Sequence, residues 1–178
     1  MKVYKFGGAS VKDAKEVQNV LHVLQTVGYT DTLLVISAMG KTTNALEMVI
    51  KHYFEKSNEL NASLLEVKKY HYQILDELFN NEEHEVYFDV NNHFADLEYF
   101  IRSNKSPNYN FVYDQIVSYG EIISTTIVSH YFNAQGLTNN WLDVRNFVKT
   151  DTTYRDAVVD WNTTQELITK GVNRNALN

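Results

Sequence analysis

The sequence has no cysteine, one proline and seven glycines among its 178 residues. The lack of cysteine excludes disulfides, thiolate catalysis and cysteine-ligated zinc, and it fits a reducing cytosol. So little proline and glycine excludes a collagen-like or low-complexity chain. Aromatic residues reach 13% and hydrophobic residues 44%, which argues against disorder and suffices for a packed core. We therefore expect one domain, or a large part of one.

Long apolar runs and clusters of basic residues are also missing. No run approaches the roughly 18 apolar residues that a membrane-spanning helix needs, and the start MKVYKFGG lacks the pattern of a secretory signal. The formal net charge is -6 and the longest basic run is Lys68-Lys69, so no surface is expected to neutralise a nucleic-acid backbone. We expect a cytoplasmic protein that binds neither membranes nor nucleic acid.

The first fifty residues alternate between strand and helix patterns. Residues 2–6 predict a short strand, and residues 32–36 are a β-branched apolar run typical of a strand buried on both faces. Apolar residues at helical spacing follow each strand, over 11–26 and 46–53. This order predicts an α/β fold with a parallel sheet, in which ligands bind at the carboxyl ends of the strands.

The rest of the chain is mainly helical in pattern. Residues 58–105 contain no strand pattern and predict a helical excursion from the sheet, with helices over 59–80 and 84–103. In the first helix, Ser10 is expected to be the N-cap and Asp13 a first-turn acid, and a loop is expected over 37–44. Further along, we expect a helix over 113–135 that stops at Gly136. A strand over 140–144, which residues 145–150 continue, and a short helix over 163–170 complete the prediction.

Two adjacent glycines follow the first strand, within the sequence KFGGAS that runs from Lys5 to Ser10. Without a Cβ atom, such a backbone can approach a bulky anion, and its N–H groups form an anion cradle in front of a helix. Lys5 adds the positive charge that phosphoryl transfer needs, because its barrier falls mainly through positioning and charge stabilisation. The same pattern also fits a tight turn beside a surface lysine.

The loop after the second strand ends in Gly40-Lys41-Thr42, which imitates the end of a P-loop. The full motif requires a glycine where this chain has Val35, so a Walker A loop is not expected. Hydroxyl and N–H groups of this loop either face a ligand or cap the following helix.

Glu121 follows Gly120 on an otherwise apolar helix, and burying such an acid is costly without a partner. The partner is either a substrate ammonium or a nearby Lys or Arg. The six histidines show no metal-ligand spacing, so we expect surface or half-buried histidines and no metal ligands from the protein.

In their order and spacing these segments resemble the amino-terminal part of the aspartate kinase family. Residues 5–11 (KFGGASV) resemble its opening signature K-F-G-G-T-S-V, and residues 36–44 resemble the loop after its second strand. Residues 117–121 (VSYGE) resemble its S-x-G-E helix, and WLDVR at 141–145, followed by Thr150-Asp151, resembles the segment after that helix.

The resemblance implies an αβα sandwich with a mainly parallel sheet, of the amino-acid kinase or carbamate kinase-like type. It implies transfer of the γ-phosphoryl group of ATP to the β-carboxylate of L-aspartate, with Mg²⁺ accompanying ATP, and a homo-oligomer in the full-length protein. The resemblance implies that Lys5 stabilises charge on the transferring phosphoryl group, and that the ATP phosphates are enclosed by Lys5, Phe6, Gly7, Gly8 and Ser10. It also implies that Ser37 and Thr43 line the substrate pocket and that Glu121 binds the aspartate ammonium.

The chain departs from the family in two ways. Ala9 replaces the usual threonine, which removes one hydroxyl from the phosphate loop. The family's G-R-G-G-S-D segment, which supplies further nucleotide and substrate contacts, is not found, so residues 1–178 are expected to be a truncated, inactive amino-terminal lobe. The alternatives are another amino-acid kinase, with glutamate or a phosphorylated acceptor, and a non-catalytic module that binds an anion or an amino acid.

Overall fold

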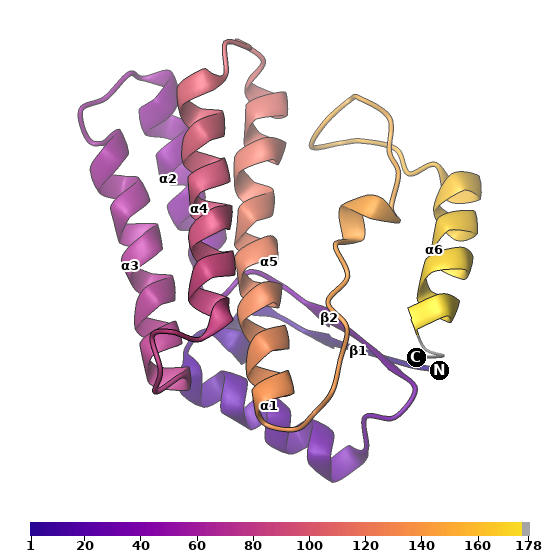
Figure 1. The fold of residues 1–178 in the computed structure, drawn as a ribbon. Helices are drawn as coiled ribbons and strands as arrows, with labels where there is room; N and C mark the ends of the chain where they lie inside the picture. The colour runs from indigo at the N-terminus through magenta and orange to yellow at the C-terminus, as the bar shows by residue number, and fades with distance from the viewer. Residues whose placement is uncertain (176–178) are drawn as a thin grey trace.

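The structure is a computed structural model that describes residues 1–175 as an α/β fold (Figure 1). Its described part contains a two-stranded sheet, six α-helices and two short 3₁₀ helices. In chain order the elements are β1 (Lys2–Phe6), η1 (Gly8–Val11), α1 (Ala14–Val27), β2 (Thr32–Ile36), α2 (Thr42–Phe54), α3 (Leu60–Leu78), α4 (Glu85–Ser103), α5 (Tyr109–Ala134), η2 (Val144–Asn146) and α6 (Trp161–Asn175).

The two strands pair in parallel, from Lys2 opposite Thr32 to Phe6 opposite Ile36, as the alternating pattern predicts. Helix α1 connects them and lies beneath the sheet (Figure 1). The prediction that the second strand is buried on both faces is wrong, because Val35 is 44% exposed. The described sheet has only two strands, so each strand has a single neighbour in it.

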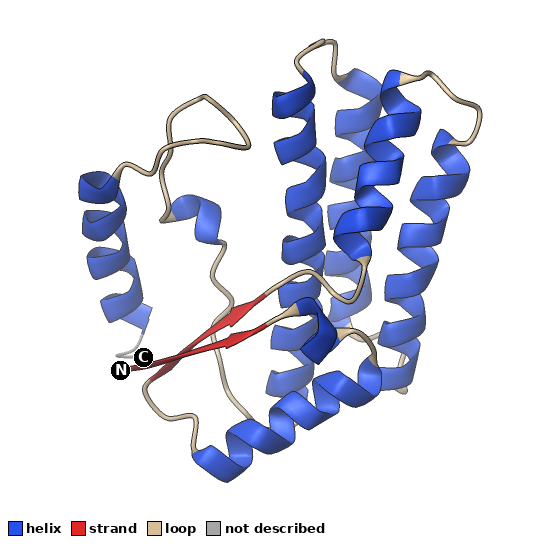
Figure 2. Cartoon of the chain, turned by 180° about the vertical axis from the view of Figure 1, so that it is seen from behind, coloured by secondary structure: helices blue, strands red, loops and turns tan. Residues whose placement is uncertain are grey.

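Helices α2, α3, α4 and α5 stand side by side as a bundle at the carboxyl ends of the strands (Figures 1 and 2). The helices predicted over 59–80 and 84–103 are confirmed as α3 and α4. Helix α5 packs against both α2 and α4 and is apolar on most of its circumference, as a central helix must be. Phe94 and Phe132 are among the largest side chains that this core buries completely. In the part of the chain that is described, no helix is both long and apolar enough to span a bilayer.

The start of α1 differs from the expected one in its capping residue. Asp13 is the N-cap, because its carboxylate accepts a hydrogen bond from the N–H of Glu16 at 2.8 Å. Ser10 lies earlier, inside η1, where its N–H donates to the carbonyl of Gly7. The first-turn acid of α1 is Glu16. The 3₁₀ turn therefore moves the helix start three residues beyond the predicted cap.

Asp13→Ala is expected to lower the free energy of unfolding by about 1 kcal/mol, because the N–H of Glu16 loses its acceptor at the helix start. Urea unfolding of the variant measures this loss. Asp13→Asn is the matched control, since asparagine retains the accepting oxygen and caps helices equally well. Equal stability of Asp13→Ala and the wild type would contradict the assignment of this cap.

The segment between α5 and α6 holds the clearest error of the sequence-based prediction. Helix α5 ends where Gly136 was expected to stop it, at a φ of +81°. Residues 140–144 were predicted to be a strand, but residues 140–143 form no strand and Val144 is the first residue of η2. The carboxylate of Asp143 accepts from the N–H of Arg145, which turns the chain into η2. A single bridge between Thr150 and Val159 is the only ladder pair outside β1 and β2 in the described residues.

Candidate functional site

Two loops meet at the carboxyl ends of the strands (Figure 2). Residues 7–12, which follow β1, are called the phosphate loop here, and residues 37–41, which follow β2, are called the substrate loop. The N–H of Ser37 donates to the carbonyl of Phe6 at 3.1 Å, and that of Gly40 donates to the carbonyl of Gly8 at 3.0 Å. A Cβ atom on Gly8 would lie 2.7 Å from the carbonyl oxygen of Ala38. Only glycine at position 8 lets the two loops approach this closely.

The 3₁₀ turn inside the phosphate loop and the helix after the substrate loop both begin without a side-chain cap. Gly7 is the N-cap of η1 and Lys41 is the N-cap of α2, and neither start has a side-chain cap. The starts of α1, α4 and α5 are capped by side chains, whereas the start of α3 is not. The N–H groups of Ser10 and Thr42 already donate to the carbonyls of Gly7 and Met39, so it is the other first-turn N–H groups at these starts that can donate to an anion.

Lys5 extends an exposed side chain from β1 toward the phosphate loop. Its Nζ lies 3.4 Å from the point that a Cβ atom of Gly7 would occupy. Lys5 also borders a hollow of about 210 Å³ between β1 and α1, with Phe6 and mostly apolar neighbours. Because this hollow is mostly apolar, the anion site fits the loop side of Lys5 better.

Glu121 reaches the substrate loop from α5. One oxygen of its half-buried carboxylate, Oε1, accepts from the N–H of Ala38 at 3.3 Å. Gly120 allows this approach, because a Cβ atom there would already lie 3.0 Å from the Cβ of Ala38. Ser124 adds a second link by donating to the carbonyl of Ser37 at 2.8 Å. Among residues 1–172, whose side chains the structure describes, Glu121 makes no ion pair with a Lys, Arg or His, so its charge is available to a ligand cation.

Two neighbouring threonines at the start of α2 differ in environment. Thr42 is buried and its hydroxyl donates to the carbonyl of Met39 at 2.7 Å. Thr43 is half-buried, as is Ser37 in the substrate loop. The Gly-Lys-Thr tail is therefore part of a loop closure rather than a P-loop, and Thr43 is the hydroxyl of the pair that can reach a ligand.

Helix α3 supplies two residues next to the site that the sequence did not single out. The hydroxyl of Tyr70 donates to the carbonyl of Lys12, and His71 is fully buried behind Thr42. His71 corrects the expectation of surface or half-buried histidines. The sequence could have indicated that His71 is buried, because it lies at helical spacing from Val67, Ile74 and Leu75, which are buried too.

His71 donates from Nδ1 to the carbonyl of Val67 at 2.7 Å, and its Nε2 lies 3.4 Å from Oγ1 of Thr42. Burial lowers the pKa of His71 from 6.5 to about 4, while the bond to Val67 opposes that shift. The ring is therefore neutral at pH 7, with its proton on Nδ1.

This pKa predicts a loss of stability in mild acid. Between pH 6.5 and 4 the unfolded state binds a proton that the folded state does not, so stability is complete above pH 6.5 and falls toward pH 4. The shift corresponds to about 3 kcal/mol. Urea unfolding at several pH values across this range gives the free energy of unfolding of the wild type and of His71→Leu. The change with pH of the difference between the two measures the contribution of His71. His22→Leu, which removes an exposed histidine, is expected to retain the loss, and a wild-type profile parallel to that of His71→Leu would contradict the prediction.

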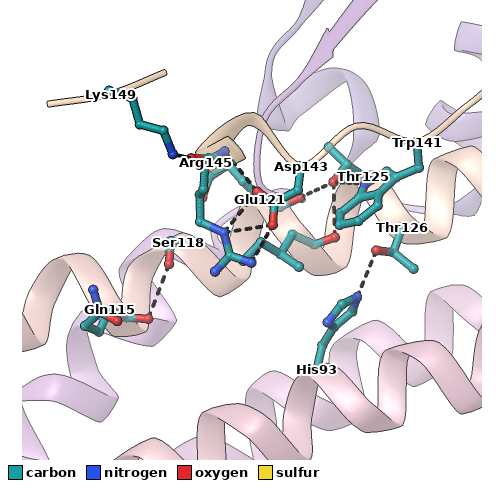
Figure 3. Close-up of polar contacts among 11 residues, drawn as sticks. His93, Gln115, Ser118, Glu121, Thr125, Thr126, Trp141, Asp143, Arg145 and Lys149 are labelled. Atoms are coloured by element: carbon teal, nitrogen blue, oxygen red, sulfur yellow. Dashed lines mark hydrogen bonds and ion pairs between the residues drawn. The ribbon is translucent and has the colours of Figure 1, made fainter. Parts of the chain in front are cut away.

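The segment after α5 returns beside the same stretch of that helix (Figure 3). The indole of Trp141 donates to Oγ1 of Thr125 at 2.9 Å, and Thr125 donates to the carbonyl of Glu121 at 2.7 Å. The guanidinium of Arg145 binds Asp143 at 2.6 to 3.0 Å and holds the pKa of that carboxyl below its usual range. These contacts support the helical turn that presents the Glu121 carboxylate.

Comparison with known proteins gives consistent matches. Residues 1–175 match the amino acid kinase family. The bifunctional aspartokinase/homoserine dehydrogenase 2 of Escherichia coli (strain K12) is 29% identical over 152 residues, covering 84% of this chain and 18% of that protein. The chloroplastic aspartokinase 1 of Arabidopsis thaliana is 31% identical over 139 residues, covering 76% of this chain and 24% of that protein.

Two solved structures of E. coli aspartokinase III share the fold at 20% sequence identity. The complex with lysine and aspartate (T-state) has a TM-score of 0.87 and covers 99% of this chain and 39% of that chain. The complex with aspartate and ADP (R-state) has a TM-score of 0.83, with coverages of 99% and 38%. The chain thus spans about a fifth to two fifths of the proteins that it matches.

Proposed function

Since this chain belongs to the amino acid kinase family, we propose that it forms the amino-terminal lobe of an aspartate kinase. The full enzyme transfers the γ-phosphoryl group of ATP to the β-carboxylate of L-aspartate and produces 4-phospho-L-aspartate. The names of the relatives support this choice within the family, and a structurally similar enzyme is described with aspartate and ADP. The resemblance further implies a cytoplasmic homo-oligomer.

The observation that most supports the proposal is the contact of a phosphate-type loop with a second loop to which the available carboxylate of Glu121 is bound. The bond between Gly40 and Gly8 joins the loops, and Glu121 is bound to Ala38 two residues before Gly40. A phosphoryl donor on the first loop and an amino acid on the second would therefore lie next to each other, as transfer between them requires.

In the proposed reaction the acceptor needs no general base. The β-carboxylate of aspartate is already ionised at neutral pH, and its oxygen attacks the γ-phosphorus while the bond to the ADP oxygen breaks. The barrier is the approach of two anions, which the ammonium of Lys5 would lower by lying between them. Glu121 would bind the substrate ammonium, and Ser37 and Thr43 would line the same pocket.

The residues present fit the phosphates of ATP, because two uncapped helix starts and one ammonium converge on the loop junction. Gly7, Gly8 and Ser10 would surround the phosphates, with Phe6 leading into the loop. The described residues contain no group of three or more His, Cys, Asp or Glu that could hold a metal ion. Mg²⁺ bound to the phosphates of ATP would neutralise part of their charge.

Titration of the purified chain with L-aspartate, D-aspartate, L-glutamate and ATP with Mg²⁺, followed by calorimetry, tests the proposal. We expect saturable binding of L-aspartate and of ATP, with L-glutamate at least tenfold weaker. Preference for L-glutamate would favour another amino-acid kinase. Binding of an amino acid without any binding of ATP would favour the non-catalytic module.

The chain alone is expected to release little or no ADP when given ATP, Mg²⁺ and L-aspartate, because the family resemblance assigns further nucleotide and substrate contacts to a segment that these residues lack. A coupled ADP-release assay measures this. Turnover at the rate of a complete aspartokinase would refute the division of the site between two lobes.

A further inference from the structure

Helix α3 contacts both loops of the proposed site through adjacent residues. The hydroxyl of Tyr70 donates to the carbonyl of Lys12, the last residue of the phosphate loop. The same hydroxyl lies 2.5 Å from the point that a Cβ atom of Gly40 would occupy, so it rests against the backbone of the substrate loop. One phenolic oxygen therefore lies where the two loops meet.

Gly40 is enclosed on three sides at this point. Its N–H is bonded to Gly8, Tyr70 lies on another side, and the Cβ of Lys12 would lie 3.4 Å from a Cβ at position 40. Its φ of +53° is a conformation that side chains rarely allow. The position of Gly40 therefore fixes the distance between the two loops. Tyr70 limits this distance because its hydroxyl lies against Gly40.

His71 supports the substrate loop from behind. Its ring is held by the bond to Val67, and its Nε2 faces the hydroxyl of Thr42, which in turn donates to Met39. Burial and the charge of Asp13 raise the pKa of Tyr70, so the neighbouring phenol keeps the proton that it donates to Lys12. Tyr70 thus touches both loops, while His71 packs behind Thr42, directly after the substrate loop.

We infer that Tyr70 and His71 are positioning residues that fix the separation of the phosphate loop from the substrate loop. This gives the helical excursion a role in the reaction, namely to set the alignment of phosphoryl donor and acceptor. The inference rests on the proposed function for its effect on ligands, whereas its effect on the loops stands on the contacts alone.

Three variants of the chain test the inference, with Tyr70→Phe as the main one. It removes only the hydroxyl, and Tyr72→Phe is the matched control because it makes the same change on α3 away from both loops. Thr42→Val removes the hydroxyl that faces His71 without altering the size of the side chain. The first readout is amide hydrogen exchange of Gly40, whose N–H is bonded to Gly8, with the amide of Gly28 at the end of α1 as reference. The second is the affinity for ATP and for L-aspartate.

Tyr70→Phe is expected to speed amide exchange at Gly40 at least tenfold and to leave the exchange rate of Gly28 unchanged. It is also expected to lower the affinity for ATP and for L-aspartate about tenfold. Thr42→Val is expected to weaken the binding of L-aspartate alone, since of the two loops it is the substrate loop to which its hydroxyl donates. Exchange at Gly40 that is the same in Tyr70→Phe and Tyr72→Phe would overturn the inference. If the wild type binds neither ligand but the difference at Gly40 persists, the proposed function fails and the role of α3 in loop spacing stands.

Discussion

Gly8→Ala is expected to abolish the paired arrangement of the two loops and to lower the affinity for both ATP and L-aspartate by tenfold or more. The added Cβ would lie 2.7 Å from the carbonyl oxygen of Ala38 and 3.0 Å from that of Gly40. Both neighbours are backbone atoms, so the strain can be relieved only by moving the loops apart. Overpacking of this kind costs about 1–3 kcal/mol of stability. Urea unfolding and calorimetric titration measure the two effects.

Gly7→Ala is the matched control for this substitution. A Cβ atom at position 7 would meet only the flexible end of Lys5, at 3.4 Å, and Gly7 has an extended backbone with a φ of -80°. Its stability is therefore expected to stay within about 0.5 kcal/mol of the wild type. If Gly8→Ala were as stable toward urea as Gly7→Ala, the close junction of the loops would not be essential.

Glu121→Gln is expected to weaken L-aspartate by about 10- to 100-fold while ATP affinity stays within twofold. Glutamine keeps an oxygen that can accept from the N–H of Ala38, so the substrate loop retains its anchor. Only the negative charge is lost, and hydrogen bonds to charged groups contribute about 1.5–3 kcal/mol. Calorimetric titration of the variant with each ligand measures the split.

Glu98→Gln makes the same chemical change on α4, where the carboxylate pairs with Lys68 of α3 at 3.9 Å. It is expected to leave both affinities unchanged. An equal loss of L-aspartate affinity in the two variants would indicate a general effect of net charge, and the assignment of Glu121 to the substrate ammonium would be wrong.

Sequence patterns predicted most of the elements because each pattern reflects a local cause. The apolar run of residues 32–36 and the helical spacing in α1 and α2 do not depend on distant contacts. The strand predicted over 140–144 failed because a strand requires a partner, and the carboxylate of Asp143 instead turns the backbone at Arg145. Capping by Asp13 rather than Ser10 likewise depends on whether the intervening turn is 3₁₀ or α.

The site was predictable only in part, for a related reason. The glycine loop and Glu121 are visible in the sequence because their residue types are unusual where they stand. The contact of Tyr70 with the phosphate loop joins residues separated by 58 positions in the chain, and no local pattern reports it. The burial of His71 is implied by helical spacing, but its place behind Thr42 follows from how α2 and α3 pack together.

The most direct test is calorimetric titration of the chain and of Lys5→Ala with ATP and Mg²⁺, and separately with L-aspartate. Lys5 projects beside Gly7 in the phosphate loop, whereas Glu121 anchors the other loop. Removing the ammonium is therefore expected to lower ATP affinity at least tenfold and to change L-aspartate affinity less than twofold. Unchanged ATP affinity, or equal losses for both ligands, would contradict a phosphoryl site at Lys5 beside a separate amino-acid site at Glu121.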